Sequence, residues 1–365
     1  MGQAVHFGQP LALVRADSVA DVDDALAELE TARAGGHWLA GFASYELGYA
    51  LEPRLLPLMP AARKLPLLCF GIYRAPDTPE WRTAGHDTAA FALGPFTPRW
   101  HLPRYREAFE LAHALIGAGE IYQTNLTFPH DAAFGGSSRA LYRRLAATQN
   151  VGYGAFLQAD GLPDILCRSP ELFFRTNAAG RIEARPMKGT MPRATRPETD
   201  AANRDFLKSD AKNRAENLMI VDLLRNDIGR IADIGSVRVP ELFAVESYAT
   251  VHQMVSGIEA QLRQGTRFSD ILRALFPCGS ITGAPKIRAM EVIRELEPWP
   301  REIYCGSIGW AAPDGASAFN VAIRTLLIDD DHASLSVGGG LVWDSNAAAE
   351  YEEARWKARF ARIGD

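Results

Sequence analysis

Lys188 lies in the stretch RPMKGTMPR, residues 185–193, between a proline–methionine pair and a Gly-Thr turn. Arg185 and Arg193 stand close on either side of it. A lysine amine in this setting is either a solvated charge on a surface loop or a group with a chemical role. The segment alone favours the solvated charge, so a chemical role needs support from the rest of the chain.

Glu216 belongs to a helix predicted over about 213–225, where it lies outside the main apolar stripe and in line with two other apolar residues. A carboxylate so placed is either lifted to solvent near the helix start, where the helix dipole favours it, or buried with a partner. This helix alone favours the capping role. The predicted buried stripe consists of Leu218, Val221, Leu224 and Ile228.

Glu350, Glu353 and Lys357 occur at positions i, i+3 and i+7 of a predicted C-terminal helix, so they project from one face. They follow the segment VGGGLVWDS, residues 337–345, in which a strand runs into three glycines. Backbone at such glycines can approach a ligand closely. The alternative is an ordinary surface pair between Glu353 and Lys357 at i, i+4.

The segment CGSITGAPKIRAMEVI, residues 278–293, predicts a helix that starts with Pro285 as its first residue. Free backbone N–H groups at a helix start bind anions. This is not a Walker A loop, because Pro285 and Ile287 flank Lys286 where that motif requires Gly and Ser or Thr. No Gly-x-Gly-x-x-Gly follows a predicted strand, and the familiar hydrolase motifs are absent as well.

The elements that must position these residues are long helical patterns interleaved with strand-like runs. Strands outnumber helices and several adjoin directly, which favours an α+β fold with antiparallel sheets. A polar, proline-containing stretch over 74–88 is a possible linker. We therefore expect an N-terminal region over 1–95 and a catalytic domain over 96–365.

The composition is that of a globular protein: of 365 residues, 47% are hydrophobic and 23% charged. A net charge of −5 argues against nucleic acid as a partner and favours a small-molecule substrate. No apolar run approaches the ~18 to 20 residues needed to cross a membrane. The four cysteines are scattered, which suits a reducing compartment, so we expect a cytoplasmic protein.

Eight segments, in order, resemble the chorismate-utilising enzyme family, and together they run from about residue 105 to residue 357. Residues 41–53, GFASYELGYALEP, are also similar to the N-terminal portion of one branch of that family. The resemblance implies an anthranilate synthase component I-like fold, with two large packed antiparallel sheets and helices outside. The segments are GEIYQTNLT, RSPELFF, RPMKGTMPR, AENLMIVDLLRNDIGRI, FPCGSITGAPKIRAM, YCGSIGW, FNVAIRTL and GGGLVWDSNAAAEYEEARWKA.

Family members bind chorismate with Mg²⁺, and the resemblance implies which residues do so here. Glu216 and Glu353 would hold the metal, with Glu350 and Asn213 nearby through water, which fits the preference of Mg²⁺ for one or two carboxylates plus substrate oxygens. Glu171 in RSPELFF matches the general acid that protonates the departing hydroxyl. The positions matching those that grip or surround the substrate are Arg324, Tyr304, Lys357, Thr282 and the backbone of Gly339 and Gly340.

Two positions divide the family by reaction. Members that add water have a lysine base where this chain has Gln123, so the resemblance implies ammonia as the nucleophile. Anthranilate synthases have alanine where this chain has Lys188, and the branch that aminates C4 of chorismate has lysine. In that branch the lysine amine attacks C2 as the C4 hydroxyl leaves, and ammonia from a glutamine amidotransferase subunit then enters at C4.

The implied product is 4-amino-4-deoxychorismate, on the route to p-aminobenzoate and folate. The alternative in the same class is anthranilate synthase component I, which aminates C2 and eliminates pyruvate. An alternative of another class is an inactive family member that acts as a binding subunit. One departure from the family is Gln253, which stands where many relatives have histidine. We therefore carry no role of that histidine over to this chain.

Overall fold

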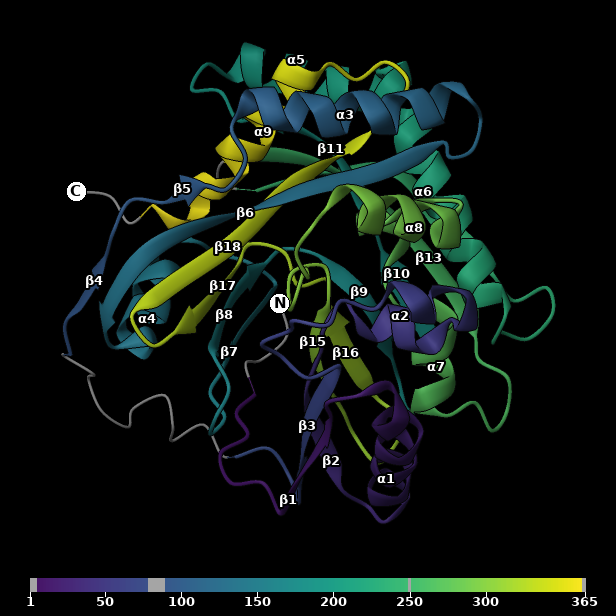
Figure 1. Ribbon diagram of the computed structural model, residues 1–365. Helices are drawn as coiled ribbons and strands as arrows, with labels where there is room; N and C mark the ends of the chain where they lie inside the picture. The colour runs from purple at the N-terminus through teal and green to yellow at the C-terminus, as the bar shows by residue number, and fades with distance from the viewer. Residues whose placement is uncertain (1–4, 78–88, 249–250, 363–365) are drawn as a thin grey trace.

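The computed structural model describes residues 5–77, 89–248 and 251–362, and its core consists of two β-sheets (Figure 1). Every strand pair in these ranges is antiparallel. Helices cover the outer faces of the sheets. The predicted α+β fold with two large antiparallel sheets is confirmed.

The ten-stranded sheet contains Lys188 on its edge strand β11, which pairs with β13. The N-terminal strands join this sheet because β2 pairs with β15, from Leu39 opposite Ala311 to Ala43 opposite Ser307. Its strands, in spatial order, are β1 (Ala12–Ala16), β3 (Leu68–Tyr73), β2 (Trp38–Ala43), β15 (Ser307–Ala311), β16 (Ser317–Asn320), β9 (Leu172–Thr176), β10 (Arg181–Arg185), β13 (Val251–Gln261) and β11 (Met187–Pro192), with β12 (Arg238–Ser247) also on β13.

The eight-stranded sheet is built around the ladder between β6 and β18. Strand residues alternate between two faces. Leu126 and Phe128 of β6 therefore enter a hydrophobic core, whereas Gln123 and Asn125 face the other way. The strands, in spatial order, are β14 (Gly283–Ala284), β6 (Gln123–Gly136), β18 (His332–Leu341), β17 (Thr325–Asp329), β8 (Asp164–Ser169) and β7 (Tyr153–Leu157), with β4 (Phe91–Leu93) and β5 (Thr97–Pro98) also on β6.

The helices pack on particular strands. Helices α8 and α9 contact β6 and β18, α5 and α6 contact β11 and β13, and α1 contacts β1 to β3. The helices are α1 (Val22–Ala34), α2 (Leu47–Leu51), α3 (Leu102–Gly117), α4 (Ser138–Thr148), α5 (Pro197–Ser209), α6 (Ala211–Gly229), α7 (Phe268–Leu275), α8 (Lys286–Leu296) and α9 (Ala347–Lys357). Short 3₁₀ helices cover Val19–Asp21, Pro53–Leu58, Gly279–Ile281 and Ala358–Ala361.

Two details of the predicted helices are wrong. Leu218, predicted to be in the buried stripe of α6, is exposed, and the stripe begins instead at Asn217. The Oδ1 of Asn217 accepts a hydrogen bond of 2.6 Å from the Ser256 hydroxyl on β13, which offsets part of the cost of burying this amide. Pro285 is the N-cap of α8 and not its first residue, and the two-residue strand β14 directly precedes it.

The predicted division at residues 95/96 stays a prediction. Strands β4 and β5, on either side of it, both pair with β6. Most of the stretch interpreted as a linker, residues 78–88, lies outside the described residues.

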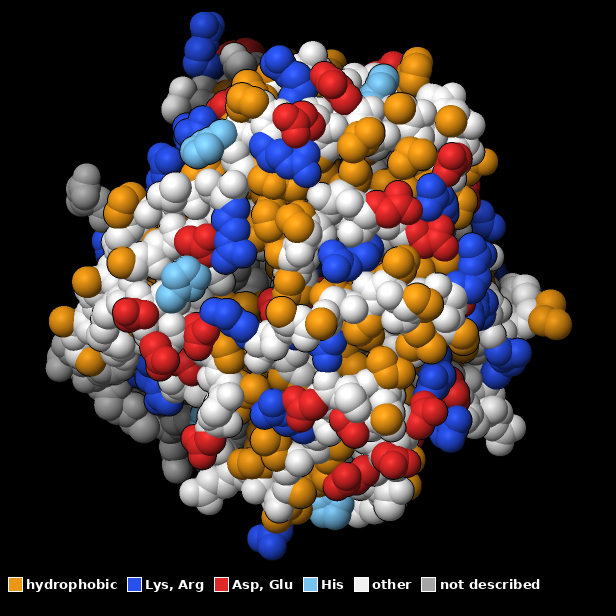
Figure 2. All heavy atoms as spheres, viewed as in Figure 1, with side chains coloured by type: hydrophobic (Ala, Val, Ile, Leu, Met, Phe, Trp, Pro, Cys, Tyr) orange, Lys and Arg blue, Asp and Glu red, His pale blue; other side chains and the backbone are white. Residues whose placement is uncertain are grey.

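On the face drawn in Figure 2, Lys and Arg side chains are interspersed with Asp and Glu. Within the described ranges, no helix combines the length and the apolar character required to cross a membrane.

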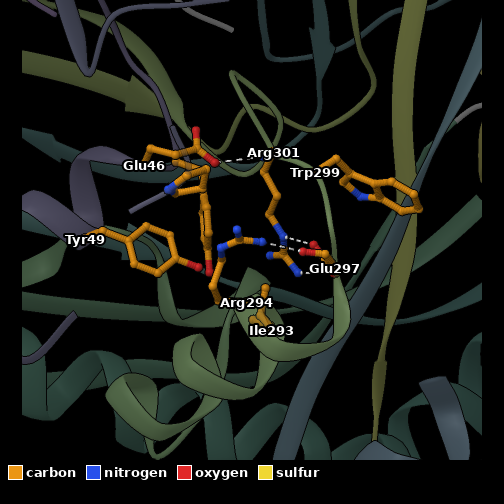
Figure 3. A pocket seen from close by; sticks show the side chains of 9 residues that line it. Glu46, Tyr49, Ile293, Arg294, Glu297, Trp299 and Arg301 are labelled. Atoms are coloured by element: carbon orange, nitrogen blue, oxygen red, sulfur yellow. Dashed lines mark hydrogen bonds and ion pairs between the residues drawn. The ribbon is translucent and has the colours of Figure 1, made fainter. Parts of the chain in front are cut away.

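Arg301 holds the N-terminal region, α8 and β6 together (Figure 3). Its guanidinium binds both carboxylate oxygens of Glu297 at 2.7 and 2.8 Å, with both side chains almost wholly buried. It also donates to the backbone carbonyl groups of Ile281 and Asn125 at 3.0 and 2.8 Å. The backbone N–H of Arg301 donates to Glu46 at 2.7 Å. One buried cation therefore fixes segments that are far apart in the sequence.

Replacing this cation should destabilise the fold strongly. In Arg301→Met the Glu297 carboxylate would be buried without its counter-ion, so we expect the free energy of unfolding in urea to fall by about 3–5 kcal/mol. The matched control is Arg225→Met, which breaks an exposed pair with Asp222 and should change it by less than about 1 kcal/mol. Equal losses in the two variants would contradict this account.

Candidate active site

Lys188 is mostly buried: 17% of its side chain is exposed. Its Nζ lies 3.4 Å from Oε2 of Glu216, which α6 presents. The turn after the lysine is held by Gln253 of β13, whose Nε2 donates to the Gly189 carbonyl at 2.7 Å and whose Oε1 accepts from Thr190 at 2.8 Å. The lysine is therefore not a solvated surface charge, and the glutamate is not a simple helix cap.

Gly340 on β18 allows three polar side chains to converge. A Cβ built on this glycine would lie 2.6 Å from Nζ of Lys188, 2.8 Å from Nε2 of Gln123 and 3.1 Å from Oδ1 of Asn125. Gln123 and Asn125 stand on the same face of β6, and Asn125 pairs directly with Gly340. The absence of a side chain at position 340 thus lets the lysine of one sheet meet the amides of the other.

A second set of polar side chains lies beside Gly339, the neighbour of Gly340 in β18. Oε2 of Glu350 and Nζ of Lys357 are close to this glycine. Lys357 donates to the Gly338 carbonyl at 2.9 Å and pairs with Glu353 at 2.9 Å. Burial acts to raise the pKa of Glu353, but the ammonium groups of Lys357 and Lys188 hold it below its ordinary value. The i, i+4 pair considered from the sequence is thus present, with 37% of the Lys357 side chain and 58% of the Glu353 side chain exposed.

Glu171 lies directly before β9 and is buried, with 5% exposed. Its Oε1 accepts a hydrogen bond of 2.8 Å from the Ser280 hydroxyl. Burial raises the pKa of Glu171 to about 7, although the Ser280 hydrogen bond and the positive charge of Lys188 act to lower it. A carboxyl group with this pKa is partly protonated near neutral pH and can give or take a proton.

Arg324 contributes a second positive charge near Glu171. Burial lowers its pKa, and its backbone adopts φ of +50°, a conformation that non-glycine residues seldom take. Among the described residues, none forms a hydrogen bond or ion pair with its guanidinium. A partly buried, unpaired guanidinium is suited to clamp a carboxylate of a ligand.

Thr282 and Tyr304, both predicted to surround the substrate, have fewer contacts with the side chains around Lys188. The Thr282 hydroxyl lies 3.2 Å from the carbonyl oxygens of Cys278 and Gly279, to which it donates. The Thr282 carbonyl accepts from the backbone N–H of Asn125, so the threonine supports β6 through its main chain. Tyr304 is buried in the hydrophobic core, and no hydrogen bond recorded for the described chain joins its hydroxyl to the Lys188 group.

Comparison with known proteins identifies the family. A family model described as chorismate binding enzyme matches residues 6–362. The chain belongs to this family. A solved relative, anthranilate synthase component I from Streptococcus pneumoniae, superposes with a TM-score of 0.84 at 25% identity, covering 98% of this chain and 92% of the other.

Curated relatives of this chorismate-binding enzyme carry a narrower name. Aminodeoxychorismate synthase component 1 of Klebsiella aerogenes is 41% identical over 86% of this chain and 74% of its own length. The protein of that name from Escherichia coli is 46% identical over 68% of this chain and 55% of its own length. The matched region thus spans about half to three quarters of these relatives.

The acidic side chains suit a hard divalent cation, because Glu216, Glu350 and Glu353 offer only carboxylate oxygens. Two of these glutamates already pair with a lysine: Glu216 with Lys188 and Glu353 with Lys357. In the described part of the chain, no three acidic, histidine or cysteine side chains lie close enough together to hold a metal ion. A metal here would therefore take part of its coordination from a ligand.

Asn125 and Ser280 are site residues that the sequence analysis did not assign. Asn125 had a detectable signal, since Gln123, Asn125 and Thr127 alternate in the sequence and would share one face of a strand. Ser280 had none, because its contact with Glu171 joins positions far apart in the chain.

The close approach at Gly340 leads to a prediction. In Gly340→Ala the new methyl group would collide with the ends of three side chains and displace them, while the strand itself can persist. We expect chorismate consumption to fall by about a hundredfold, with a thermal midpoint close to that of the parent. Gly229→Ala, where a methyl group meets open space, is the control. Normal turnover in Gly340→Ala would show that this convergence is not needed.

Proposed function

We propose that the chain is the aminating subunit of an aminodeoxychorismate synthase, which converts chorismate and ammonia to 4-amino-4-deoxychorismate and water. The observation that carries the proposal is the buried amine of Lys188, set between Glu216 and Gln123 within reach of the charge of Glu171. The names of the curated relatives support the same reaction.

The reaction proceeds in two substitutions. In the first, the lone pair of Lys188 Nζ forms a bond to C2, both conjugated ring double bonds shift, and the C4–O bond breaks. Glu171 protonates the departing hydroxyl, which leaves as water. In the second, ammonia forms a bond to C4, both double bonds shift back, and the C2–N bond breaks to restore the lysine. The Glu171 carboxylate takes the proton that the new amine releases.

Charged groups around the amine would bind the two carboxylates of chorismate. Arg324 is the candidate for a bidentate clamp, because it is partly buried and has no partner among the described residues. Further candidates are Lys357, whose Nζ lies beside Gly339, and the backbone of Gly339 and Gly340, the latter next to Nζ of Lys188. Tyr304 and Thr282 are kept as candidates for the surrounding wall.

Mg²⁺ would be held by Glu216 and Glu353, with Glu350 and Asn213 nearby through water. When bound it would neutralise a substrate carboxylate at the acidic side of the site. The ammonia would come from a separate glutamine amidotransferase subunit, in keeping with the designation component 1 in the relatives' names. These steps belong to folate and p-aminobenzoate formation.

Two alternatives are separated by the product. Anthranilate synthase would place the amine at C2 and release pyruvate, and the solved neighbour keeps this alternative open. A binding subunit without activity would leave chorismate unchanged. The chain incubated with chorismate, Mg²⁺ and an ammonium salt should give a product with the mass of 4-amino-4-deoxychorismate and no pyruvate.

The nucleophile assignment predicts a covalent intermediate. With ammonia withheld, chorismate and Mg²⁺ should produce an adduct on the peptide containing residues 185–193, detected by mass spectrometry after rapid acid quench. Lys188→Ala should abolish it. Lys188→Arg should not restore activity, because a guanidinium stays protonated and cannot attack.

The matched control for this experiment is Lys212→Ala, which removes an exposed lysine 4.0 Å from the same Glu216 carboxylate. It should keep the adduct and most of the turnover. If the parent forms no adduct and Lys188→Arg stays active, the lysine acts only as a positive charge.

The hydrogen bond from Ser280 predicts a change in pH dependence. The acid must be protonated, so the rate falls as the pH rises through the pKa of Glu171, which is about 7. Ser280→Ala removes a hydrogen bond that lowers this pKa. The alkaline limb of kcat/KM should therefore move to higher pH, whereas exposed Ser209→Ala should leave it in place. An unchanged profile in Ser280→Ala would mean that another group titrates.

A further inference from the structure

Ser280 links the Glu171 carboxyl group to a buried thiol. Its hydroxyl oxygen lies 2.8 Å from Oε1 of Glu171 and 3.2 Å from Sγ of Cys278. All three residues are buried, and Cys278 belongs to the hydrophobic core. Among the described residues, the Ser280 hydroxyl has no further hydrogen-bond partner. The carboxyl group, the hydroxyl and the thiol thus form a hydrogen-bonded chain that leads from the site into the core.

Cys278 and Ser280 are held on one short turn. Cys278 is the N-cap of the 3₁₀ helix that contains Ser280, so the two residues are two positions apart. The Thr282 hydroxyl donates to the Cys278 carbonyl at 3.2 Å. The turn also packs directly against α6, because a Cβ at Gly279 would overlap the side chain of Leu223. The thiol and the hydroxyl therefore have little freedom to move apart.

The direction of the chain follows from the protons that are available. An ionised Glu171 has only acceptor oxygens, so the Ser280 hydroxyl donates its single proton to it. The bond to sulfur must then come from the thiol, which donates to a lone pair of the Ser280 oxygen. Burial and the charge of Glu171 raise the pKa of Cys278 to about 12, although Lys286 acts to lower it. The thiol therefore keeps its proton near neutral pH.

We propose that Cys278 is a positioning residue for the general acid: its thiol donates to the Ser280 hydroxyl and directs the proton of that hydroxyl to Oε1 of Glu171. This inference rests on the proposed function. A hydroxyl that accepts a hydrogen bond becomes a stronger donor itself. The thiol thus strengthens the contact that stabilises the carboxylate, and it adjusts how readily Glu171 gives its proton to the departing hydroxyl.

Other groups around Glu171 favour its carboxylate form as well. They are the ammonium group of Lys188, the backbone N–H of Met187 and the guanidinium of Arg324. Within the described chain, none of them forms a hydrogen bond with the thiol of Cys278. Their effect would remain in a variant at position 278, so such a variant isolates the contribution of the thiol.

The first test observes the thiol directly and needs no substrate. The S–H stretching band of Cys278 is isolated by subtracting the infrared spectrum of Cys278→Ala from that of the parent. As the pH rises through the pKa of Glu171, about 7, the new charge draws the Ser280 proton closer and makes the Ser280 oxygen a better acceptor. The band should therefore move to lower frequency. Glu171→Gln and Ser280→Ala should each remove this pH dependence.

Cys69 provides the matched control, because it is a free cysteine that is also 3% exposed and has no recorded hydrogen bond to Ser280. Its band, isolated with Cys69→Ala, should not move over the same pH range. Cys278→Ser has no S–H group either, and it serves for the subtraction if alanine disturbs the fold. A Cys278 band that stays fixed in the parent, or that still moves in Ser280→Ala, would overturn the inference.

The second test measures the pH profile of kcat/KM for chorismate. Loss of the thiol weakens the hydrogen bond that stabilises the Glu171 carboxylate, so the acid stays protonated to higher pH. The alkaline limb in Cys278→Ala should move up by about 0.3–0.5 pH unit. Cys278→Ser keeps a donor and should hold the limb closer to that of the parent, and Cys69→Ala should leave it in place.

A double variant decides whether the thiol acts through the hydroxyl. Cys278→Ala should add nothing to the shift caused by Ser280→Ala, because the relay is already broken there. Shifts that add, or an unchanged limb in Cys278→Ala, would mean that Cys278 only fills space. If the parent yields no aminated chorismate, the proposed function fails, whereas a fixed band or limb in an active parent overturns only the role of Cys278.

Discussion

The ladder between β6 and β18 pairs ten residues of each strand, from Thr124 opposite Leu341 to Ala133 opposite His332. A slip of one residue would turn every side chain of β6 to the other face. Gln123 and Asn125 would then enter the hydrophobic layer, and Leu126 would face Lys188. The chemistry proposed here therefore depends on a register that is set by hydrophobic packing on the opposite side of the same strand.

The site is assembled across two sheets and not within one. Lys188 comes from the edge of the ten-stranded sheet, the amides and glycines come from the eight-stranded sheet, and Glu216 comes from α6. Arg301 and Glu297 tie this arrangement together, because the carboxylate of Glu297 also accepts from the backbone of Thr127 on β6. A change at this buried pair would reach the reacting groups through the backbone of β6 without touching them.

Sequence patterns predicted the fold class. The resemblance covers eight ordered segments, and it assigned most residues of the candidate site. Periodicity alone placed Glu353 and Lys357 on one face, as observed. It failed at Leu218 and Asn217, because the burial of an asparagine depends on a partner from a distant strand, Ser256. Contacts of this kind, including that of Ser280 with Glu171, depend on tertiary packing, which local spacing does not encode.

The pairing of β2 with β15 has a consequence for how the chain is made. Residues 38–43 cannot complete their sheet until residues 307–311 have left the ribosome. At roughly 5–20 residues per second, synthesis leaves the early strands without this neighbour for on the order of tens of seconds. During that interval the edge of β2 is open to pairing with other chains. Production at lower temperature or with chaperones should therefore affect yield more than it does for proteins whose strands pair locally.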